Sequence, residues 1–233
     1  MKGDEDVENL AEELQEQLEC ITVFSIGPIE IKESVVVTWI IMAIIVLISW
    51  LLTRNLVPDP TKITKRQLLV ETAVSGLRNM VQNILGEHGG AYAPYLTTVL
   101  LYLGISNLIG LLGFKPPTKD LNVTAALAIM SIILIEYAGL HKKGLKKWLH
   151  SFIEPVAIML PFNILELAIK PVSLCMRLFG NVLGAFVIME LIKAVLPVGL
   201  PIPFSMYFDI FDGLIQAYVF VFLTGLYIKE SVE

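Results

Sequence analysis

The sequence predicts an all-α integral membrane protein with five transmembrane helices and one amphipathic, membrane-associated helix. Hydrophobic residues make up 55% of the 233 positions and charged residues only 17%, whereas soluble domains carry about 25% charged residues. The mean hydropathy is +0.72, and several uncharged runs are long enough to cross a hydrocarbon core of about 30 Å. No basic stripe is interleaved with aromatic residues, so the composition does not suggest nucleic-acid binding.

Residues 1–33 precede the membrane domain and form an acidic segment that we expect outside the membrane. Eight of the first 19 residues are acidic, and Lys2 is the only base among them. The pI of about 5.3 therefore reflects this segment, and the rest of the chain is slightly basic. The segment lacks the basic start and the early apolar core of a signal peptide, so we expect none here.

The first predicted span covers residues 34–53, a run of twenty uncharged residues. The next predicted helix, at about 63–86, has a different pattern. Its apolar residues recur at helical spacing, and polar residues occupy its other faces. These apolar positions are Leu69, Ala73, Leu77, Met80 and Ile84. The pattern is typical of a helix that lies on the membrane surface or packs along other helices.

The membrane domain, residues 34–233, continues with predicted spans at about 95–113 and 121–140. Pro116 and Pro117 lie in the turn between them, where they interrupt neither helix. Residues 152–196 form one apolar stretch that is too long for a perpendicular span, so this helix must tilt, bend or lie partly flat. The last span is predicted at about 203–228. No internal repeat is evident, which argues against an inverted-repeat transporter.

Basic residues in the short loops predict the orientation. The loops after the first and third spans are rich in Lys and Arg, whereas Lys115 and Lys119 are the only basic residues in the loops expected on the opposite side. Short loops that are rich in Lys and Arg stay in the cytoplasm. We therefore expect the N-terminus outside and the C-terminus in the cytoplasm. The cytoplasmic residues would be Arg54, Lys62, Lys65, Arg66, Lys142, Lys143, Lys146 and Lys147.

Arg177 lies deep within the long apolar helix. An arginine at the centre of a membrane helix costs about 2.5–3.5 kcal/mol on insertion scales, and it keeps its proton at ordinary pH. It is therefore a poor proton relay, but it can repel cations and attract a carboxylate on a moving partner. Glu166, Lys170, Asn181 and Gly184 share its helix stripe. Small residues near Arg177 allow another surface to approach closely.

Further acids lie toward the ends of the two long helices. Glu166 is about 16 Å from Arg177 on the cytoplasmic side. Glu190 lies toward the outer side, about 140° around the helix from Arg177. Asp209, Asp212 and Gln216 follow at positions i, i+3 and i+7 near the outer end of the last span, on one helix face. Carboxylates in wet cavities can relay protons or coordinate Na⁺.

Structural explanations remain open for each of these residues. Arg177 could be a counter-ion to Glu166 or Asp212, since buried charges are usually paired. Asp209 and Asp212 could mark an exposed helix start with favourable capping and dipole interactions. Glu190 could form an i, i+3 ion pair with Lys193, and Gln216 could bond a neighbouring helix.

The segment Lys-Pro-Val-Ser-Leu-Cys-Met-Arg-Leu-Phe-Gly-Asn at 170–181 closely resembles the a subunit of rotary F-type ATP synthases. Other stretches are similar to that family and occur in the same order, so the resemblance covers nearly the whole chain after about residue 20. These stretches are Phe24–Pro28, Ser106–Leu111, Pro116–Thr124, Pro161–Glu166 and Gln216–Phe220.

The resemblance implies a stator subunit that is not itself an enzyme and needs no cofactor. Two offset half-channels would load and unload H⁺ or Na⁺ on the carboxylates of a c-subunit ring, with the last two spans long and tilted against the ring. Arg177 would separate the half-channels and meet each ring carboxylate, with Asn181 and Gln216 near it. Glu166 would belong to the cytoplasmic half-channel and Asp209 to the outer one.

The resemblance also implies partners and a location. We expect the c ring, the b-subunit peripheral stalk, the rest of the ATP synthase and membrane lipid, in a bacterial plasma membrane. The chain has no phosphate-binding loop of the GxxxxGK[ST] type, so ATP chemistry would lie on a partner. The sequence does not decide between H⁺ and Na⁺.

One position departs from the family. Five residues after the asparagine many members carry an acid or a histidine, whereas this chain has Phe186. Glu190 follows one turn later, about 6 Å further out. We hypothesise that Glu190, with Asp209 and Asp212, takes the outer-side role.

Two other classes of protein remain as alternatives. A secondary transporter could use Arg177 to bind an anionic substrate, and would be expected to show a repeat and a discontinuous helix. A membrane scaffold would pair Arg177 internally, and its loss would harm folding rather than ion coupling.

Overall fold

A computed structural model describes residues 22–26, 29–54, 64–86, 89–112, 114–151, 160–195, 199 and 201–232. Most of the acidic segment expected outside the membrane lies outside these residues, as do residues 152–159, where the fourth span was predicted to begin. Within the described part, five helices are long and apolar enough to cross a membrane, namely Glu33–Thr53, Gly90–Leu111, Leu121–Lys143, Leu160–Lys193 and Pro203–Val232. The predicted class, an all-α multi-pass membrane protein, is confirmed.

The chain order is a small hairpin followed by helices. The hairpin is β1 (Thr22–Ile26) and β2 (Ile29–Lys32), paired antiparallel, and it was not predicted. The α-helices are α2 (Glu33–Thr53), α3 (Lys65–Leu85), α4 (Ala93–Leu108), α5 (Leu121–Lys143), α6 (Leu145–Ser151), α7 (Leu160–Val195), α8 (Pro201–Ser205) and α9 (Gly213–Val232). Short 3₁₀ turns are η2 (Gly90–Tyr92), η3 (Ile109–Leu112) and η4 (Pro117–Lys119), and η6 (Met206–Asp212) is a π-helix.

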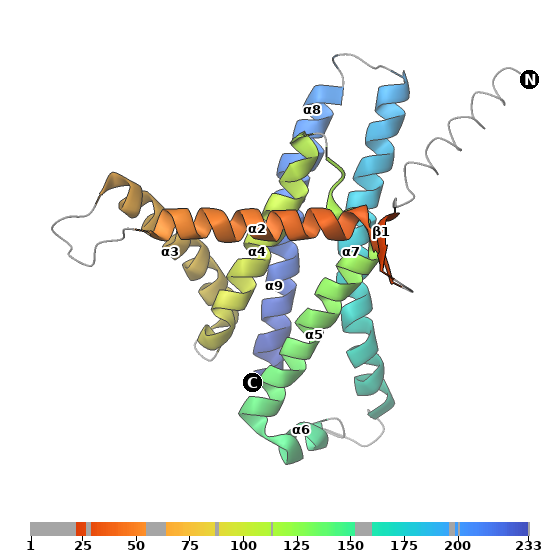
Figure 1. Cartoon of the computed structure of the whole chain (residues 1–233). Coiled ribbons are helices and arrows are strands. Elements are labelled where there is room, and N and C mark those ends of the chain that lie inside the picture. Colours follow the sequence, from red (N-terminus) through yellow and green to blue (C-terminus); the bar gives the residue numbers. More distant parts are fainter. Residues whose placement is uncertain are drawn as a thin grey trace, which may run out of the picture.

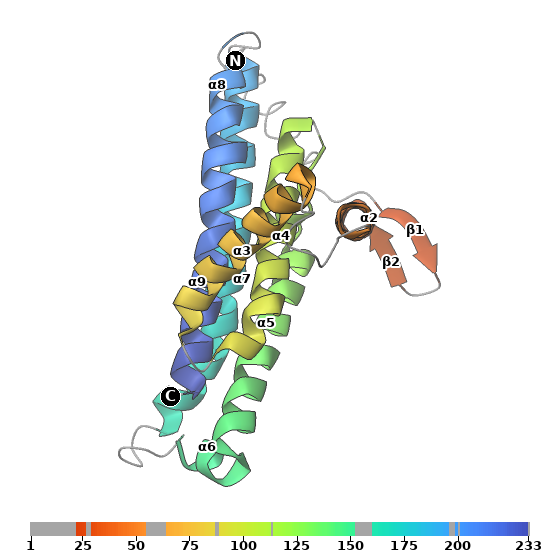
Figure 2. The same ribbon diagram turned by 90° about the vertical axis from the view of Figure 1, so that its left-hand side faces the viewer.

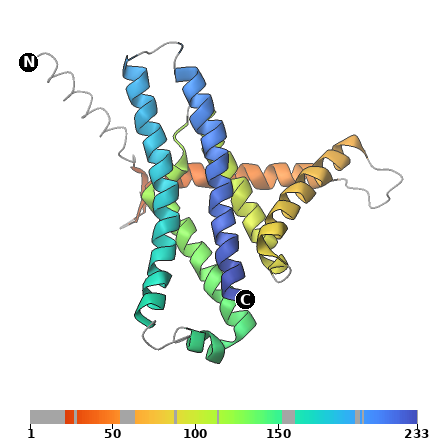
Figure 3. The same cartoon turned by 180° about the vertical axis from the view of Figure 1, so that it is seen from behind.

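Four of these helices form a bundle. The helices α7 and α9 make up one face, with α4 and α5 behind them (Figure 3), and α5 packs against both α7 and α9. The side chains of Leu103 on α4, Ile135 on α5, Leu178 on α7 and Phe220 on α9 are almost completely buried. The α8 end and the α6 end of this bundle lie far apart (Figure 1).

The first span, α2, lies crosswise to the bundle, and Figure 2 shows it end-on while the bundle helices run lengthwise. Only Ser34 and Ile41 of α2 are buried, and its remaining apolar surface is available to lipid. Ser34 Oγ donates to Asp120 Oδ2 over 2.5 Å, and the Thr38 and Tyr102 hydroxyls lie 3.1 Å apart. These two contacts join one end of α2 to the bundle.

The lengths of α2 and α7 bear on how the bundle meets a membrane. With 21 residues, α2 is about 32 Å long and matches a hydrocarbon core of about 30 Å. With 36 residues, α7 is about 54 Å long and cannot fit that core along the membrane normal. The crosswise arrangement allows α2 to stand upright while α7 is strongly tilted.

The helix α3 corresponds to the amphipathic helix predicted at about 63–86. It packs against α4 and α9 through Val81 and Leu85, which are buried, whereas Leu68 and Leu69 are exposed. Its C-terminal half therefore packs along other helices, one of the two alternatives that its sequence left open.

Candidate ion-path site

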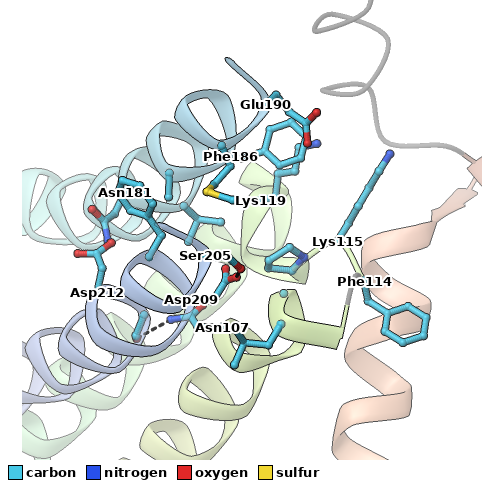
Figure 4. A pocket seen from close by; sticks show the side chains of 18 of the residues that line it. Asn107, Phe114, Lys115, Lys119, Asn181, Phe186, Glu190, Ser205, Asp209 and Asp212 are labelled. Carbon is cyan, nitrogen blue, oxygen red and sulfur yellow. Dashed lines mark hydrogen bonds between the residues drawn. The ribbon is translucent and has the colours of Figure 1, made fainter. Parts of the chain in front are cut away.

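A cavity of about 600 Å³ opens at the α8 end of the bundle, between α7, η6, the end of α4 and the η4 turn (Figure 4). Three of the predicted acids line it, Glu190, Asp209 and Asp212, together with the amides Asn107 and Asn181. We call this space the carboxylate cavity. Its volume has room for several water molecules. The structure thus brings the acids predicted for the outer side into one place.

Each of these carboxylates is held through one oxygen. Asn181 Nδ2 donates to Asp212 Oδ2 and Ser205 Oγ donates to Asp209 Oδ2, both over 2.6 Å (Figure 4). Glu190 Oε1 forms an ion pair with Lys193 Nζ at 2.8 Å. Among the described residues, the second oxygen of each carboxylate has no hydrogen-bond partner. These oxygens are available to water or to an ion.

Asp209 also packs closely against η3, the turn that follows α4. A Cβ atom added at Gly110 would lie 2.7 Å from Asp209 Oδ1, which is too close for a real side chain. Glycine at 110 therefore leaves the space that this carboxylate occupies.

Asp209 and Asp212 both lie in the π-helix η6, within a continuous helical run that starts at Pro201. Asp209 is therefore not at a helix start, which removes the capping explanation for this pair. A π-helix closes i→i+5 hydrogen bonds. Such helices are rare, occur mostly as single turns and are frequently found at functional sites. Because its turn is wider than an α-turn, the spacing i, i+3, i+7 no longer defines one face, and Gln216 does not line the cavity.

Gln216 is instead buried on α9, with 7% of its surface exposed. Within the described chain its Nε2 has no hydrogen-bond partner, and neither does the buried Ser106 Oγ on α4. An unpaired buried polar group costs about 1–3 kcal/mol, so ordered water is the expected partner at such places. Next to Ser106, Asn107 Nδ2 donates to the Gly213 carbonyl over 2.8 Å and fixes α4 against the start of α9.

Arg177 lies on the exposed surface of α7. In the described part of the chain it forms no hydrogen bond or ion pair, since Glu166 pairs with Lys170 at 3.0 Å and Asp212 bonds Asn181. Neither proposed internal counter-ion is therefore its partner. A Cβ added at Gly180 or Gly184 would meet no atom within 4 Å, so the surface beside Arg177 is open.

A second group of charges lies toward the α6 end of the bundle. Lys170 Nζ lies 3.0 Å from Glu166 Oε1 and 3.4 Å from Glu230 Oε2, and 5.0 Å from the centre of the Tyr227 ring. Lys170 thereby links α7 to α9. Sequence reasoning missed Glu230, because an acid in the polar C-terminal tail gives no signal of such a contact.

Arg177 lies between the two groups along α7. The carboxylate cavity ends at Asn181, four residues or about 6 Å further along the helix, and Glu166 lies eleven residues, about 16 Å, in the other direction. The structure therefore does not gather all the predicted residues in one site. It places the acids and Asn181 in two groups, with Arg177 and Gln216 in neither.

The η4 turn that closes the cavity is fixed by Asp120. This carboxylate caps α5 by accepting from the Asn122 backbone N–H over 2.9 Å, and it also accepts from Ser34 Oγ. Burial disfavours its charge, but the bonds from Ser34 and Asn122 and the charge of Lys32 outweigh burial and hold the pKa of Asp120 below its ordinary value.

Lys119, at the end of η4, is the second residue that sequence reasoning missed. Its ammonium lies 3.5 Å from the centre of the Phe186 ring, and only 7% of the residue is exposed. The position where the chain departs from the family pattern thus carries a cation–π contact. No group of three or more His, Cys, Asp or Glu that could hold a metal is found in the described ranges.

The fold and these two groups define a multi-pass membrane protein. It presents, between two sets of carboxylates, an arginine that has no partner among the described residues. The family model of the ATP synthase A chain matches residues 35–229, and the chain belongs to this family. It is thus a subunit of the membrane sector of an ATP synthase, as the resemblance of residues 170–181 predicted.

The chain is similar to individual family members over most of its length. It is 37% identical to "ATP synthase subunit a 2" of a Bradyrhizobium species, over 90% of this chain and 92% of that one. It is 36% identical to "ATP synthase subunit a" of Moorella thermoacetica, over 91% and 96%, and 34% identical to "ATP synthase subunit a 2" of Acaryochloris marina, over 89% and 88%.

Proposed function

We propose that this chain is the ion-conducting stator subunit that loads and unloads H⁺ or Na⁺ on the carboxylates of a rotating c-subunit ring. The observation that carries the proposal is the position of Arg177, which is exposed, has no partner in the described chain and lies between two groups of acids. A charge left unpaired at the surface of a membrane helix is costly, so a partner outside this chain is expected to meet it.

The carboxylate cavity is the outer half-channel in this proposal. Ions enter through water in the cavity and pass along Glu190, Asp209 and Asp212, whose second oxygens can accept a proton. The path then reaches the Asn181–Asp212 hydrogen bond, one turn from Arg177. Gln216, whose Nε2 has no partner among the described residues and is expected to bind water, continues the polar path.

The charges at the α6 end form the cytoplasmic half-channel. Glu166 with Lys170 and Glu230 provides a polar path from the open face of α7. The four lysines around the α5–α6 turn, Lys142, Lys143, Lys146 and Lys147, lie at this same end (Figure 1) and favour the cytoplasmic side of a bacterial plasma membrane. The N-terminus is then outside and the C-terminus is cytoplasmic.

Arg177 performs two tasks at the ring. Its permanent charge opposes direct passage of a cation from one half-channel to the other, and it attracts an arriving ring carboxylate so that the carboxylate gives up its ion. The open surface at Gly180 and Gly184 lets the ring helices approach closely. The face formed by α7 and α9 (Figure 3) is the ring-facing side of the subunit.

ATP chemistry lies on partner subunits in this proposal, and the b-subunit stalk holds the chain against the turning ring. One elementary charge moving through 100 mV releases about 2.3 kcal/mol. Several ions must therefore pass for each ATP, which a ring with many carboxylates allows.

The test is ATP-driven ion uptake into vesicles that contain the purified complex. Arg177→Ala is compared with wild type and with Arg78→Ala, which removes an exposed arginine of α3. We expect Arg177→Ala to assemble with the ring and the catalytic head and to hydrolyse ATP, but not to pump, while Arg78→Ala pumps normally.

Normal pumping by an assembled Arg177→Ala complex would show that this arginine does not couple ion flow to rotation. Repeating the uptake with ²²Na⁺ in the presence of a protonophore distinguishes Na⁺ from H⁺ as the transported ion.

A further inference from the structure

Two contacts join the neighbouring helices α7 and α9 (Figure 3), one on each side of Arg177. Toward the α8 end Asn181 bonds Asp212, and toward the α6 end Lys170 Nζ lies 3.4 Å from Glu230 Oε2. Each of the two helices packs more extensively against α5 than against the other. The Lys170 contact is therefore a direct link between helices that are otherwise held mainly through a third one.

The first part of α7 has little packing of its own. None of the described side chains from 160 to 173 is buried, whereas Leu174 and Leu178 are almost completely buried. Pro171 lies inside the helix, where a proline removes one backbone hydrogen bond and favours a bend. We call residues 160–170 the arm of α7, because they form an exposed stretch that precedes this weak point.

Lys170 connects the arm to two turns of α9. Its ammonium lies 3.0 Å from Glu166 Oε1 on the arm itself, and 5.0 Å from the centre of the Tyr227 ring, within the range of a cation–π contact. Tyr227 and Glu230 lie about one turn apart on α9. The Lys170 side chain is 17% exposed, whereas those of Glu166 and Glu230 are about half exposed, so the ammonium is enclosed by its partners.

This end of α9 is itself fixed to α5. Ile228 is almost completely buried, and Ser231 Oγ donates to the Ile135 carbonyl over 3.1 Å. A Cβ atom at Gly139 would collide with Ser231 Oγ, so the glycine allows the two helices to approach this closely. The contact from Lys170 therefore attaches the arm to an anchored helix end.

We propose that Lys170 is a positioning residue of the cytoplasmic half-channel, which holds the arm of α7 against α9 next to Pro171 and so keeps Glu166 in a fixed place on the ion path. This inference rests on the proposed function, in which Glu166 belongs to that half-channel. Lys170 acts through Glu166 and does not itself bind or release an ion. Without the link the arm can swing about Pro171, and Glu166 spends less time in line with the passing ring.

The experiment measures ATP-driven ion uptake into vesicles that contain the whole ATP synthase. We expect Lys170→Met to assemble and to pump roughly tenfold more slowly than wild type, since it loses charged hydrogen bonds to half-exposed partners. Lys170→Arg should recover most of the rate, because a guanidinium can bond both carboxylates. Lys146→Met is the matched control, which removes an exposed lysine of α6 and should pump normally.

A double-mutant cycle tests the partner on α9. Glu230→Gln alone should slow pumping less than Lys170→Met does, because Lys170 keeps its contact with Glu166. The double variant should pump no more slowly than Lys170→Met, since a link that is already broken cannot be lost again. Effects that multiply would mean that Lys170 and Glu230 do not act through their contact, and would contradict the inference.

A covalent link separates positioning from a direct role of the charge. In a chain with Cys20 and Cys175 replaced by serine, Lys170→Cys and Glu230→Cys are joined by a thiol cross-linker about as long as the two side chains that it replaces. This variant should pump slowly before cross-linking and recover toward the wild-type rate afterwards, although no charge returns. A fully cross-linked complex that stays slow would show that Lys170 acts through its charge and not as a link.

Normal pumping by an assembled Lys170→Met complex overturns the inference. If that variant does not assemble, Glu230→Gln decides, and an unchanged rate there overturns it as well. The proposed function is tested separately by Arg177→Ala. A pumping defect in Arg177→Ala together with normal pumping in Lys170→Met would therefore reject the role of Lys170 alone.

Discussion

At the scale of single residues, the site depends on how each charge is compensated. Lys170 has two acidic neighbours and Glu190 has one basic neighbour, whereas Arg177 has no charged partner in the described chain. A pair with an exposed member contributes little to stability. The Glu190–Lys193 pair is of this kind, because the Lys193 side chain is 52% exposed, so stability alone does not explain an acid at this position.

This contrast predicts different results for the two members of the pair. If Glu190 relays ions, Glu190→Gln should slow proton pumping by roughly a hundredfold to ten-thousandfold, the range of losses of a proton-transfer group. Lys193→Met should leave pumping within about fivefold of wild type, because an exposed pair contributes at most about 1 kcal/mol. ATP-driven quenching of a pH-sensitive dye in vesicles measures both.

Equal and small effects of the two substitutions would mean that Glu190 and Lys193 form only a structural pair. The outer-side role would then fall to Asp209 and Asp212.

Sequence reasoning identified the residues that stand out from an apolar background. It missed residues whose roles arise only from tertiary contacts. Four charged residues lie in long apolar helices, namely Arg177, Glu190, Asp209 and Asp212. The free-energy cost of a charge at such a position is enough to single them out. Lys119 looked like an ordinary loop lysine, because its contact with Phe186 joins positions far apart in the chain. Glu230 was missed for the same reason.

At the scale of elements, the η4 turn links the first span to the bundle. Asp120 accepts from Ser34 of α2 while it caps α5, and the adjacent Thr118 bonds Asn107 of α4. Few local signals in a sequence predict such a junction. The prolines of 113–120 predicted a turn here, but not its burial between helices.

Replacing Asp120 should destabilise this junction. Asp120→Ala removes the cap of α5 and the acceptor for Ser34, and a loss of about 1–2 kcal/mol in the free energy of unfolding is expected. Thr64→Ala is the matched control, because Thr64 is the N-cap residue of α3 but makes no side-chain capping bond, and it should cost much less. Thermal unfolding of the detergent-solubilised complex compares them.

The contribution of Asp120 to the free energy of unfolding should decrease in acid. The pKa of Asp120 is lowered in the folded chain from its ordinary value of 3.8, so its ionised form stabilises the fold above that value. This contribution is lost as the pH falls through the lower, folded pKa. The difference in the free energy of unfolding between wild type and Asp120→Ala should therefore be constant near neutral pH and shrink in acid. A difference that grew in acid would contradict the assignment.

Helix positions followed from hydropathy, but helix type did not. The predicted helix at 63–86 corresponds to α3 at Lys65–Leu85, and the apolar run at 34–53 corresponds to α2 at Glu33–Thr53. Hydropathy does not distinguish the π-helix η6 from an α-helix, because it depends on the residue types and not on the backbone hydrogen-bond pattern. The hairpin β1–β2 is too short for a clear alternating pattern.

At the scale of the whole molecule, α2 and the bundle run in different directions (Figure 1). The sequence predicted that the long helix must tilt, bend or lie partly flat, because its length alone requires one of these. The crosswise position of α2 could not be predicted, since a helix that is apolar on all sides carries no information about its neighbours.

The proposed orientation can be measured by chemical labelling. In a chain with Cys20 and Cys175 replaced by serine, Lys146→Cys lies in α6 and Lys115→Cys lies at the α8 end. In inverted vesicles, where the cytoplasmic face is outside, a membrane-impermeant maleimide should label Lys146→Cys and not Lys115→Cys. Right-side-out vesicles should give the opposite pattern. Labelling of Lys115→Cys from the cytoplasmic face would reverse the assigned topology.

The open surface around Arg177 has a further meaning for newly made chains in the cell. A copy that is inserted in the membrane before its partners arrive exposes this guanidinium to lipid tails, at a cost of about 2.5–3.5 kcal/mol. Under the proposed function, such a copy carries this cost until the ring covers the arginine. The abundance of this subunit in cells should therefore follow the supply of ring subunits rather than its own rate of synthesis.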